Sequence, residues 1–253
     1  MSVNMPRTAM VFAAGLGRRM RPLSESVPKP LLRVAGQPIL DHVLDRLEAA
    51  GVAQVVVNAH WQPDAIHAAL AARAANHRGP RTVEQVEDAL LETGGSAASA
   101  LRAGRIGPDP FFLLNGDAMW LNGPVPALRR LAAAFDPASM DAMLLLGGMT
   151  RAVGEVGHGD FAVDAHGTPR RPRAGEITPY IFTGVQIVSP RLFDAAPEGG
   201  FSMNRLWDRA MEAGRLGVIV HDSLWFHLSR PADITAAEHV LHSTLNPDSD
   251  TGL

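Results

Sequence analysis

The 253-residue chain contains no cysteine, which excludes disulfide bridges, thiolate metal sites and cysteine nucleophiles. No apolar segment approaches the roughly 20 residues needed to span a bilayer, and the opening residues MSVNMPRT contain no apolar signal core. The formal net charge is only −3, so the chain has no excess of positive charge for binding nucleic acid. We therefore expect a cytoplasmic protein that binds neither membranes nor nucleic acids.

Short apolar segments alternate with helical ones along the first half of the chain, and the second half is less regular. Strands are predicted over 8–13, 54–58, 82–86, 110–115, 143–146, 161–163 and 180–188, and helices over 39–50, 64–75, 94–103, 204–213 and 232–245. This alternation predicts an α/β fold with a mostly parallel sheet and helices on both faces. Ligands of such sheets bind beyond the carboxyl ends of the strands.

No linker rich in Gly, Ser or Pro divides the chain, and no internal repeat is visible. We therefore expect one domain over residues 1–245. The polar residues 246–253 are predicted to form a disordered tail.

A small-residue turn follows the first predicted strand. It is built from Ala13, Ala14, Gly15 and Gly17, which remove side chains where the backbone must approach a ligand. Free N–H groups in such a loop can bind an anion, and Arg18, Arg19 and Arg21 add permanent positive charges suited to phosphate oxygens. The turn is thus predicted to hold a nucleoside triphosphate.

Lys29 lies between Pro28 and Pro30. The two prolines favour an extended backbone on both sides and exclude the interior of a helix. A lysine on such a stiff segment can direct its charge at a phosphoryl group that gains negative charge during reaction.

Two further segments place polar or small residues where a nucleotide could bind. Asn115, Gly116 and Asp117 end a buried strand, and a carboxylate at that position suits Mg²⁺ bound to phosphates. Gly94 and Gly95 open a predicted helix and would let a ligand approach the main chain. Taken alone, residues 115–117 are better explained as an ordinary turn. Glu92, just before the two glycines, could contact the nucleotide or merely solvate the end of the helix.

The stretch AAGLGRRMRPLS, followed by PKPLLRVAGQPIL, covers residues 13–40 and resembles the opening signature of the sugar-phosphate nucleotidyltransferases. Arg18 and Met20 depart from the usual Thr and Leu. The resemblance implies a Rossmann-like three-layer α/β/α fold with a mostly parallel mixed sheet. It also implies that Arg19 and Lys29 act on phosphates and that Asp117 holds the catalytic metal, Mg²⁺ or alternatively Mn²⁺. Nucleotide contacts are implied for Ala13, Ala14, Gly15, Gly17, Glu92, Gly94, Gly95 and Asn115.

Segments of the second half, GDF, IFTGVQIVSPRLF and FSMNRLWD, resemble the sugar-binding half of the same enzymes. The resemblance implies that residues 1–150 mainly bind the nucleotide and residues 151–245 mainly bind the sugar. It is strongest with the branch that joins UTP to N-acetylmuramate α-1-phosphate in cell-wall sugar recycling. The sugar-binding residues implied are Asp160, Thr183, Gly184 and Asn204, each of which could instead cap a loop. Trp207 has helical spacing with Met203 and Ala210, and is predicted to lie in the core.

The segment WFHLSRP departs from the family pattern WxDVGTP, whose aspartate is the second metal ligand. This chain has His227 at that position, Ser229 for the glycine and Arg230 for the threonine. His227 either ligates a metal less selectively, or hydrogen-bonds phosphate or water, or leaves the ion to Asp117 and substrate oxygens.

The expected reaction is nucleotidyl transfer from a nucleoside triphosphate to a sugar 1-phosphate, by a monomer or small homo-oligomer. Guanylyl transfer to mannose 1-phosphate is the main alternative, because the opening motif does not choose a base. A non-catalytic sugar-nucleotide sensor is a further alternative, because WFHLSRP departs from the family pattern. A nicotinamide dehydrogenase is disfavoured, because Met20 stands where its third glycine would be.

Overall fold

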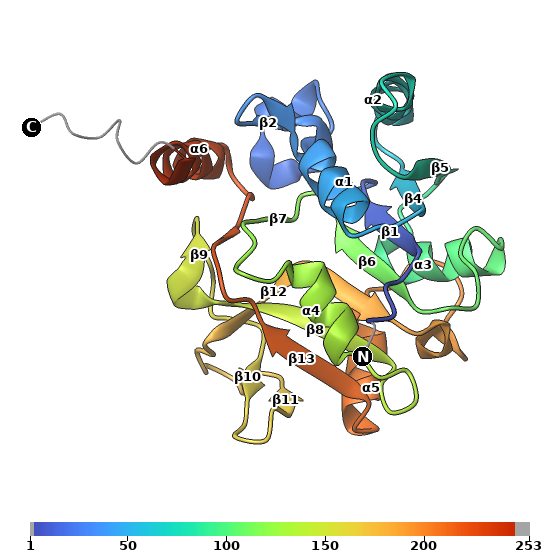
Figure 1. The fold of residues 1–253 in the computed structure, drawn as a ribbon, viewed down its shortest axis with the longest axis vertical. Helices are drawn as coiled ribbons and strands as arrows, with labels where there is room; N and C mark the ends of the chain where they lie inside the picture. Colours follow the sequence, from blue (N-terminus) through green and yellow to red (C-terminus); the bar gives the residue numbers. More distant parts are fainter. Residues whose placement is uncertain (1–2, 246–253) are drawn as a thin grey trace, which may run out of the picture.

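The computed structural model describes residues 3–245, so the tail predicted over 246–253 lies outside the described residues. A single seven-stranded sheet forms the centre of the molecule (Figure 1). Its order is β13-β8-β12-β6-β1-β4-β5. The strands are β1 (Thr8–Phe12), β4 (Gln54–Ala59), β5 (Arg81–Val86), β6 (Phe111–Asn115), β8 (Ala142–Gly148), β12 (Tyr180–Val188) and β13 (Leu216–Val220).

Strand β12 is the one strand of this sheet that runs antiparallel to its neighbours, β6 and β8. The pairs β1/β4, β1/β6, β4/β5 and β8/β13 are parallel. The sheet is therefore mixed and mostly parallel, which confirms the predicted fold class.

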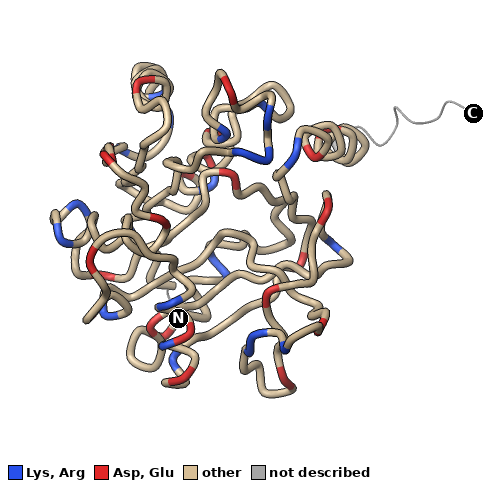
Figure 2. Tube along the Cα trace, turned by 180° about the vertical axis from the view of Figure 1, so that it is seen from behind, with Lys and Arg blue, Asp and Glu red and all other residues tan. Residues whose placement is uncertain are grey.

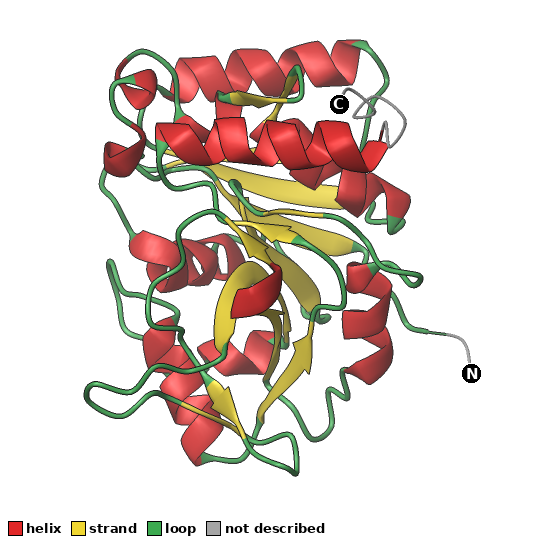
Figure 3. Ribbon diagram, turned by 90° about the vertical axis from the view of Figure 1, so that its left-hand side faces the viewer, coloured by secondary structure: helices red, strands yellow, loops and turns green. Residues whose placement is uncertain are grey.

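Helices cover both faces of the sheet (Figure 3). Residues of α1 (Ile39–Ala49), α2 (Pro63–Ala75) and α4 (Ala127–Ala134) share one buried cluster with Ala9, Val11 and Val57. Residues of α3 (Glu92–Arg102) and α5 (Asn204–Glu212) share another cluster with Met10 and Val56. Successive strand residues point to opposite faces, so β1 contributes to both clusters and the molecule has three layers.

The last helix, α6 (Pro231–Leu245), lies beside the sheet rather than on it (Figure 1). Ala237 and Leu241 of this helix pack in a third cluster with Met20 and Leu32 from the signature segment. Helix α6 therefore supports the loop that the sequence predicts to bind the nucleotide.

Small elements complete the fold. A three-stranded sheet has the order β7 (Met119–Trp120), β14 (Trp225–Phe226) and β9 (Ala152–Val153), and two hairpins are β2/β3 (Arg33–Val34, Gln37–Pro38) and β10/β11 (Ala162–Val163, Pro169–Arg170). Single 3₁₀ turns span Arg18–Met20, Leu23–Glu25, Lys29–Leu31, Met149–Arg151 and Pro190–Phe193.

Acidic and basic positions are interspersed over the chain trace (Figure 2). None of the helices in residues 3–245 combines the length and apolar character required to traverse a bilayer.

Candidate active site

The signature loop begins where β1 ends. Gly17 has a left-handed φ of 58°, and a Cβ on it would lie 3.0 Å from the Cβ of Lys29 and 3.2 Å from that of Ser24. A side chain there would therefore separate the loop from the Lys29 segment. Among residues 3–245, the N–H groups of Gly15 and Gly17 have no protein acceptor, so both are available to an anion.

Lys29 begins a 3₁₀ turn, Lys29–Leu31. The prediction of an extended backbone on both sides was therefore wrong on the C-terminal side. A single turn accepts Pro30 near its start because that position needs no donor, whereas Pro28 keeps its extended conformation (ψ 136°). Lys29 is the only lysine of the chain.

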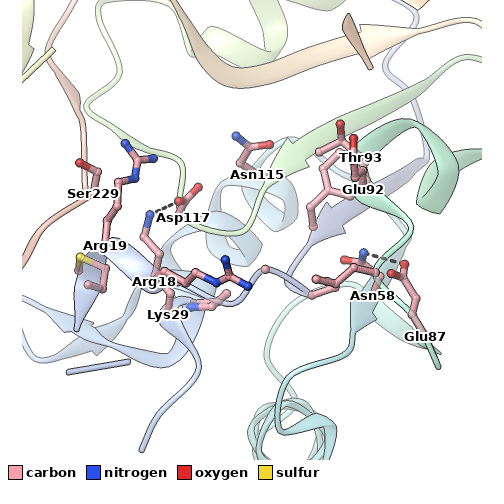
Figure 4. A pocket seen from close by; sticks show the side chains of 17 residues that line it. Arg18, Arg19, Lys29, Asn58, Glu87, Glu92, Thr93, Asn115, Asp117 and Ser229 are labelled. Carbon is pink, nitrogen blue, oxygen red and sulfur yellow. Dashed lines mark hydrogen bonds and ion pairs between the residues drawn. The ribbon is translucent and has the colours of Figure 1, made fainter. Parts of the chain in front are cut away.

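The ammonium group of Lys29 forms an ion pair with the carboxylate of Asp117 (Figure 4). The two side chains are 13% and 33% exposed. Asp117 follows β6 through Gly116, where a Cβ would lie 2.6 Å from the carbonyl oxygen of Phe12. The glycine thus lets the chain turn tightly against β1 and bring Asp117 to the carboxyl end of the sheet.

The segment after β14 joins the same site because β14 pairs with β7. Phe226 lies opposite Met119, so the residues following Phe226 run beside those preceding Met119. The pKa of His227 lies below its usual value because the ring is partly buried and Arg19 is close, with Lys29 adding to the effect and Asp233 opposing it. His227 is thus a neutral imidazole next to two cations.

These elements enclose a cavity of about 370 Å³ (Figure 4). Of the residues predicted to bind the nucleotide or act in catalysis, nine lie on its wall: Ala14, Gly15, Gly17, Arg18, Arg19, Lys29, Glu92, Asn115 and Asp117. Arg21, predicted to add charge to the same site, is not among the lining residues. The nine residues come from three regions of the sequence, which the parallel strands β1 and β6 and the start of α3 bring together.

A buried polar network forms the opposite end of the cavity. Asn58 accepts a hydrogen bond from the Ala13 N–H (2.7 Å) and donates to Glu87 (2.9 Å) and Ser96 (2.8 Å). The N–H of Ala13 is therefore engaged inside the protein, and Ala13 lies behind the cavity wall with 1% exposure. The network fixes the start of the signature loop against β4 and β5.

Sequence reasoning missed Asn58, Glu87 and Thr93, and it named Ser229 beside His227 without assigning it a contact. All four residues line the cavity. Asn58 is the penultimate residue of β4, and Glu87 directly follows β5. The rule that ligands bind beyond the carboxyl ends of parallel strands would have identified both, had it been applied to these strands as it was to β1 and β6.

Gly94 and Gly95 lie against residues 199–201 rather than on the cavity wall. A Cβ on Gly94 would meet the Phe201 ring at 2.4 Å, and one on Gly95 would meet the Gly199 carbonyl oxygen at 2.2 Å. Both N–H groups donate to the Phe201 carbonyl oxygen. These glycines thus permit close packing of α3 on another segment, and a direct contact with the nucleotide stays a prediction.

The four predicted sugar-binding residues each have a structural partner. Asp160 accepts from the Phe182 N–H (2.9 Å), Thr183 donates to the Leu145 carbonyl (2.8 Å), and Asn204 accepts from Arg171 (2.9 Å). Gly184 has a φ of 82°, and a Cβ on it would lie 2.9 Å from Asn115. Only Gly184 is thereby placed directly beside a residue of the cavity, and the sugar contacts of all four stay predictions. Trp207 is 6% exposed and belongs to the core, as predicted.

The side chains that line the cavity indicate how a metal ion could be held there. Within residues 3–245, no three His, Cys, Asp or Glu side chains converge to form a metal-binding group. Asp117 supplies a carboxylate beside cationic groups suited to phosphate. One carboxylate with substrate oxygens and water is a normal environment for Mg²⁺, so the residues fit a metal that is shared with a bound phosphate.

Comparison with known proteins agrees with this geometry. Residues 9–156 match the family of MobA-like NTP transferase domains. The chain is 42% identical to N-acetylmuramate α-1-phosphate uridylyltransferase of Caulobacter vibrioides, over 92% of this chain and 96% of that protein. It is 32% identical to the enzyme of the same name from Neisseria meningitidis serogroup B, over 91% and 96%.

Among solved structures, the inositol-1-phosphate CTP transferase from T. maritima superposes with a TM-score of 0.76. The alignment covers 98% of this chain and 99% of the other at 19% identity, so this likeness is one of fold. The family match and the two relatives aligned over nearly their full length establish that this chain belongs to the MobA-like NTP transferases, as a sugar-1-phosphate nucleotidyltransferase.

Proposed function

We propose that the chain transfers a uridylyl group from UTP to N-acetylmuramate α-1-phosphate, forming UDP-N-acetylmuramate and pyrophosphate. The observation that carries the proposal is the 42% identity to a Caulobacter vibrioides enzyme of this activity over nearly the whole of both chains. Such a product would serve the recycling of cell-wall sugars.

In this proposal a phosphate oxygen of the sugar 1-phosphate attacks the α-phosphorus of UTP. A new P–O bond forms as the bond from the α-phosphorus to the oxygen that bridges it to the β-phosphorus breaks, and that oxygen leaves with the pyrophosphate. The nucleophile is already an anion, so no general base is needed. Catalysis then depends on holding the two phosphates in line and on neutralising their charge.

The cationic wall of the cavity supports this assignment. Lys29 would leave its ion pair with Asp117 and bind the α-phosphate and the sugar phosphate. Arg19 would bind the β- and γ-phosphates and stabilise the leaving pyrophosphate. The free N–H groups of Gly15 and Gly17 would add hydrogen bonds to the bound nucleotide.

Asp117 would hold Mg²⁺, with Mn²⁺ as an alternative, together with substrate oxygens. When bound, the ion supplies positive charge to the phosphate oxygens. Asp117 can turn to it because Lys29, its partner in the free protein, is then engaged by phosphate.

The test is a pyrophosphate-release assay with UTP, GTP, dTTP and CTP, each paired with the 1-phosphates of N-acetylmuramate, glucosamine, glucose and mannose. We expect the highest kcat/KM with UTP and N-acetylmuramate α-1-phosphate. A preference for GTP with mannose 1-phosphate would replace the proposed substrates. Binding of these ligands without pyrophosphate release from any pair would support a sensor instead.

A further inference from the structure

Ser229 is a cavity residue that neither the signature nor the reaction scheme uses. It is 4% exposed, and its side chain lines the same cavity as Arg19, Lys29 and Asp117. Among the described residues its hydroxyl group has no hydrogen-bond partner. Figure 4 draws it on the side of the cavity where Arg19 lies. A hydroxyl without a protein partner on a cavity wall is available to a ligand.

Asp233 fixes the backbone that carries Ser229. One carboxylate oxygen, Oδ2, accepts hydrogen bonds from the N–H groups of Ser229 (2.8 Å) and Arg230 (2.7 Å). Asp233 is itself 6% exposed and lies in the first turn of α6. Because residues of α6 also share a buried cluster with Met20, the residue after Arg19, one helix supports the segments that carry both Ser229 and Arg19.

We propose that Ser229 binds the pyrophosphate end of the triphosphate by donating a hydrogen bond to a phosphate oxygen, and that Asp233 positions it. The family pattern has a glycine at this position, which offers no hydroxyl group. The added donor lies next to His227, where the same pattern has a carboxylate. The segment has thus exchanged a negative side chain for neutral hydrogen-bonding groups beside Arg19.

The proximity to Arg19 decides which phosphate Ser229 contacts. In the proposed function, on which this inference rests, Arg19 binds the leaving pyrophosphate. Leu228, the residue before Ser229, shares a buried cluster with Met20, the residue after Arg19, and Figure 4 draws Ser229 and Arg19 on the same side of the cavity. Ser229 therefore binds the same phosphates as Arg19, and not the α-phosphate.

The direct test is to titrate the full chain with magnesium pyrophosphate and measure the Kd by isothermal titration calorimetry. We expect Ser229→Ala to raise the Kd about tenfold, the usual effect of losing a hydrogen bond to a charged group. Ser229→Thr keeps the hydroxyl and is expected to bind within about threefold of the wild type. Asp233→Ala, which removes the acceptor of both N–H bonds, should weaken binding as Ser229→Ala does, and the double variant should be no worse than either single variant.

Two controls come from the same helix. Glu238→Gln alters a carboxylate of α6 that accepts from the Ala35 N–H, and Ser243→Ala removes a hydroxyl bonded to the His239 carbonyl. Both should leave the Kd for pyrophosphate unchanged. If Asp233→Ala melts far below the wild type, the comparison of Ser229→Ala with Ser229→Thr decides the role of the hydroxyl.

The forward reaction gives a second readout. Ser229→Ala should raise the KM for the triphosphate but not the KM for the sugar 1-phosphate. An unchanged Kd for pyrophosphate in Ser229→Ala would overturn the proposal, and so would equal losses for both substrates. Because the binding experiment uses neither UTP nor a sugar, it remains decisive even if the proposed substrates are wrong.

Discussion

Replacing Lys29 by methionine removes one positive charge from the cavity and keeps most of the side-chain volume. A unit charge about 4 Å from a phosphate oxygen is worth about 4 kcal/mol at the effective dielectric constant of about 20 found near protein surfaces. Because the lysine side chain is only 13% exposed, water replaces little of this stabilisation. We expect turnover to fall about a thousandfold, near the upper end of the loss seen when one preorganised donor is removed.

Stability should respond far less than turnover. Asp117, the ion-pair partner, is 33% exposed and regains water when the ammonium group is removed. The free energy of unfolding should therefore change by about 1 kcal/mol or less.

The assay is steady-state pyrophosphate release with saturating substrates, accompanied by urea unfolding of the same preparations. Lys29→Arg serves as the matched variant. It retains the positive charge but spreads it over a planar guanidinium group, and it should retain more activity than Lys29→Met. If the folded Lys29→Met protein turns over within about threefold of the wild type, the positive charge of Lys29 does not stabilise the transition state.

Three further predictions concern other parts of the chain. Gly95→Ala places a Cβ 2.2 Å from the Gly199 carbonyl oxygen and should lower the free energy of unfolding, measured by urea titration, by about 1–3 kcal/mol. The control Gly107→Ala places a Cβ with no neighbour within 4 Å and should leave that free energy unchanged. Burial lowers the pKa of His221 below its usual value of 6.5. The unfolded chain therefore binds a proton at a higher pH than the folded protein does, and the free energy of unfolding should decline as the pH falls below about 6.5. Unfolding measured from pH 7.5 to 5.5 should show a weaker decline in His221→Leu. His227→Asp adds a second carboxylate near Asp117 and should raise the affinity for Mn²⁺ in the absence of nucleotide. Electron paramagnetic resonance measures this affinity, and an unchanged value would place residue 227 outside the metal site.

The sequence predicted the parallel core of the fold well because its strands are short apolar runs between clear helices. Helix α1 was placed within one residue because Pro38 and Gly51 mark its two ends. Helix α4 and strand β13 were not predicted. Helix α4 spans only Ala127–Ala134, too few residues for a periodic pattern, and the edge strand Leu216–Val220 follows α5 after a short turn.

The candidate site was predictable where it depends on local sequence and not where it depends on distant pairing. Arg19 and Lys29 lie in one continuous motif. The proximity of Ser229 to that motif depends on the pairing of β14 with β7 and on the buried cluster that Leu228 shares with Met20. Only the resemblance of WFHLSRP to a metal-ligand segment pointed to it. The packing role of Gly94 and Gly95 depends equally on residues more than 100 positions away.

Because Lys29 is the only lysine, the chain carries its sole side-chain amine inside the cavity. Acylating dyes and amine-coupled surfaces, which usually modify many lysines at random, would have a single side-chain target here. Labelling of that amine should therefore inactivate the protein in proportion to its extent, and a bound triphosphate should protect it. The degree of modification, read by mass spectrometry, would then report how much of the cavity is occupied.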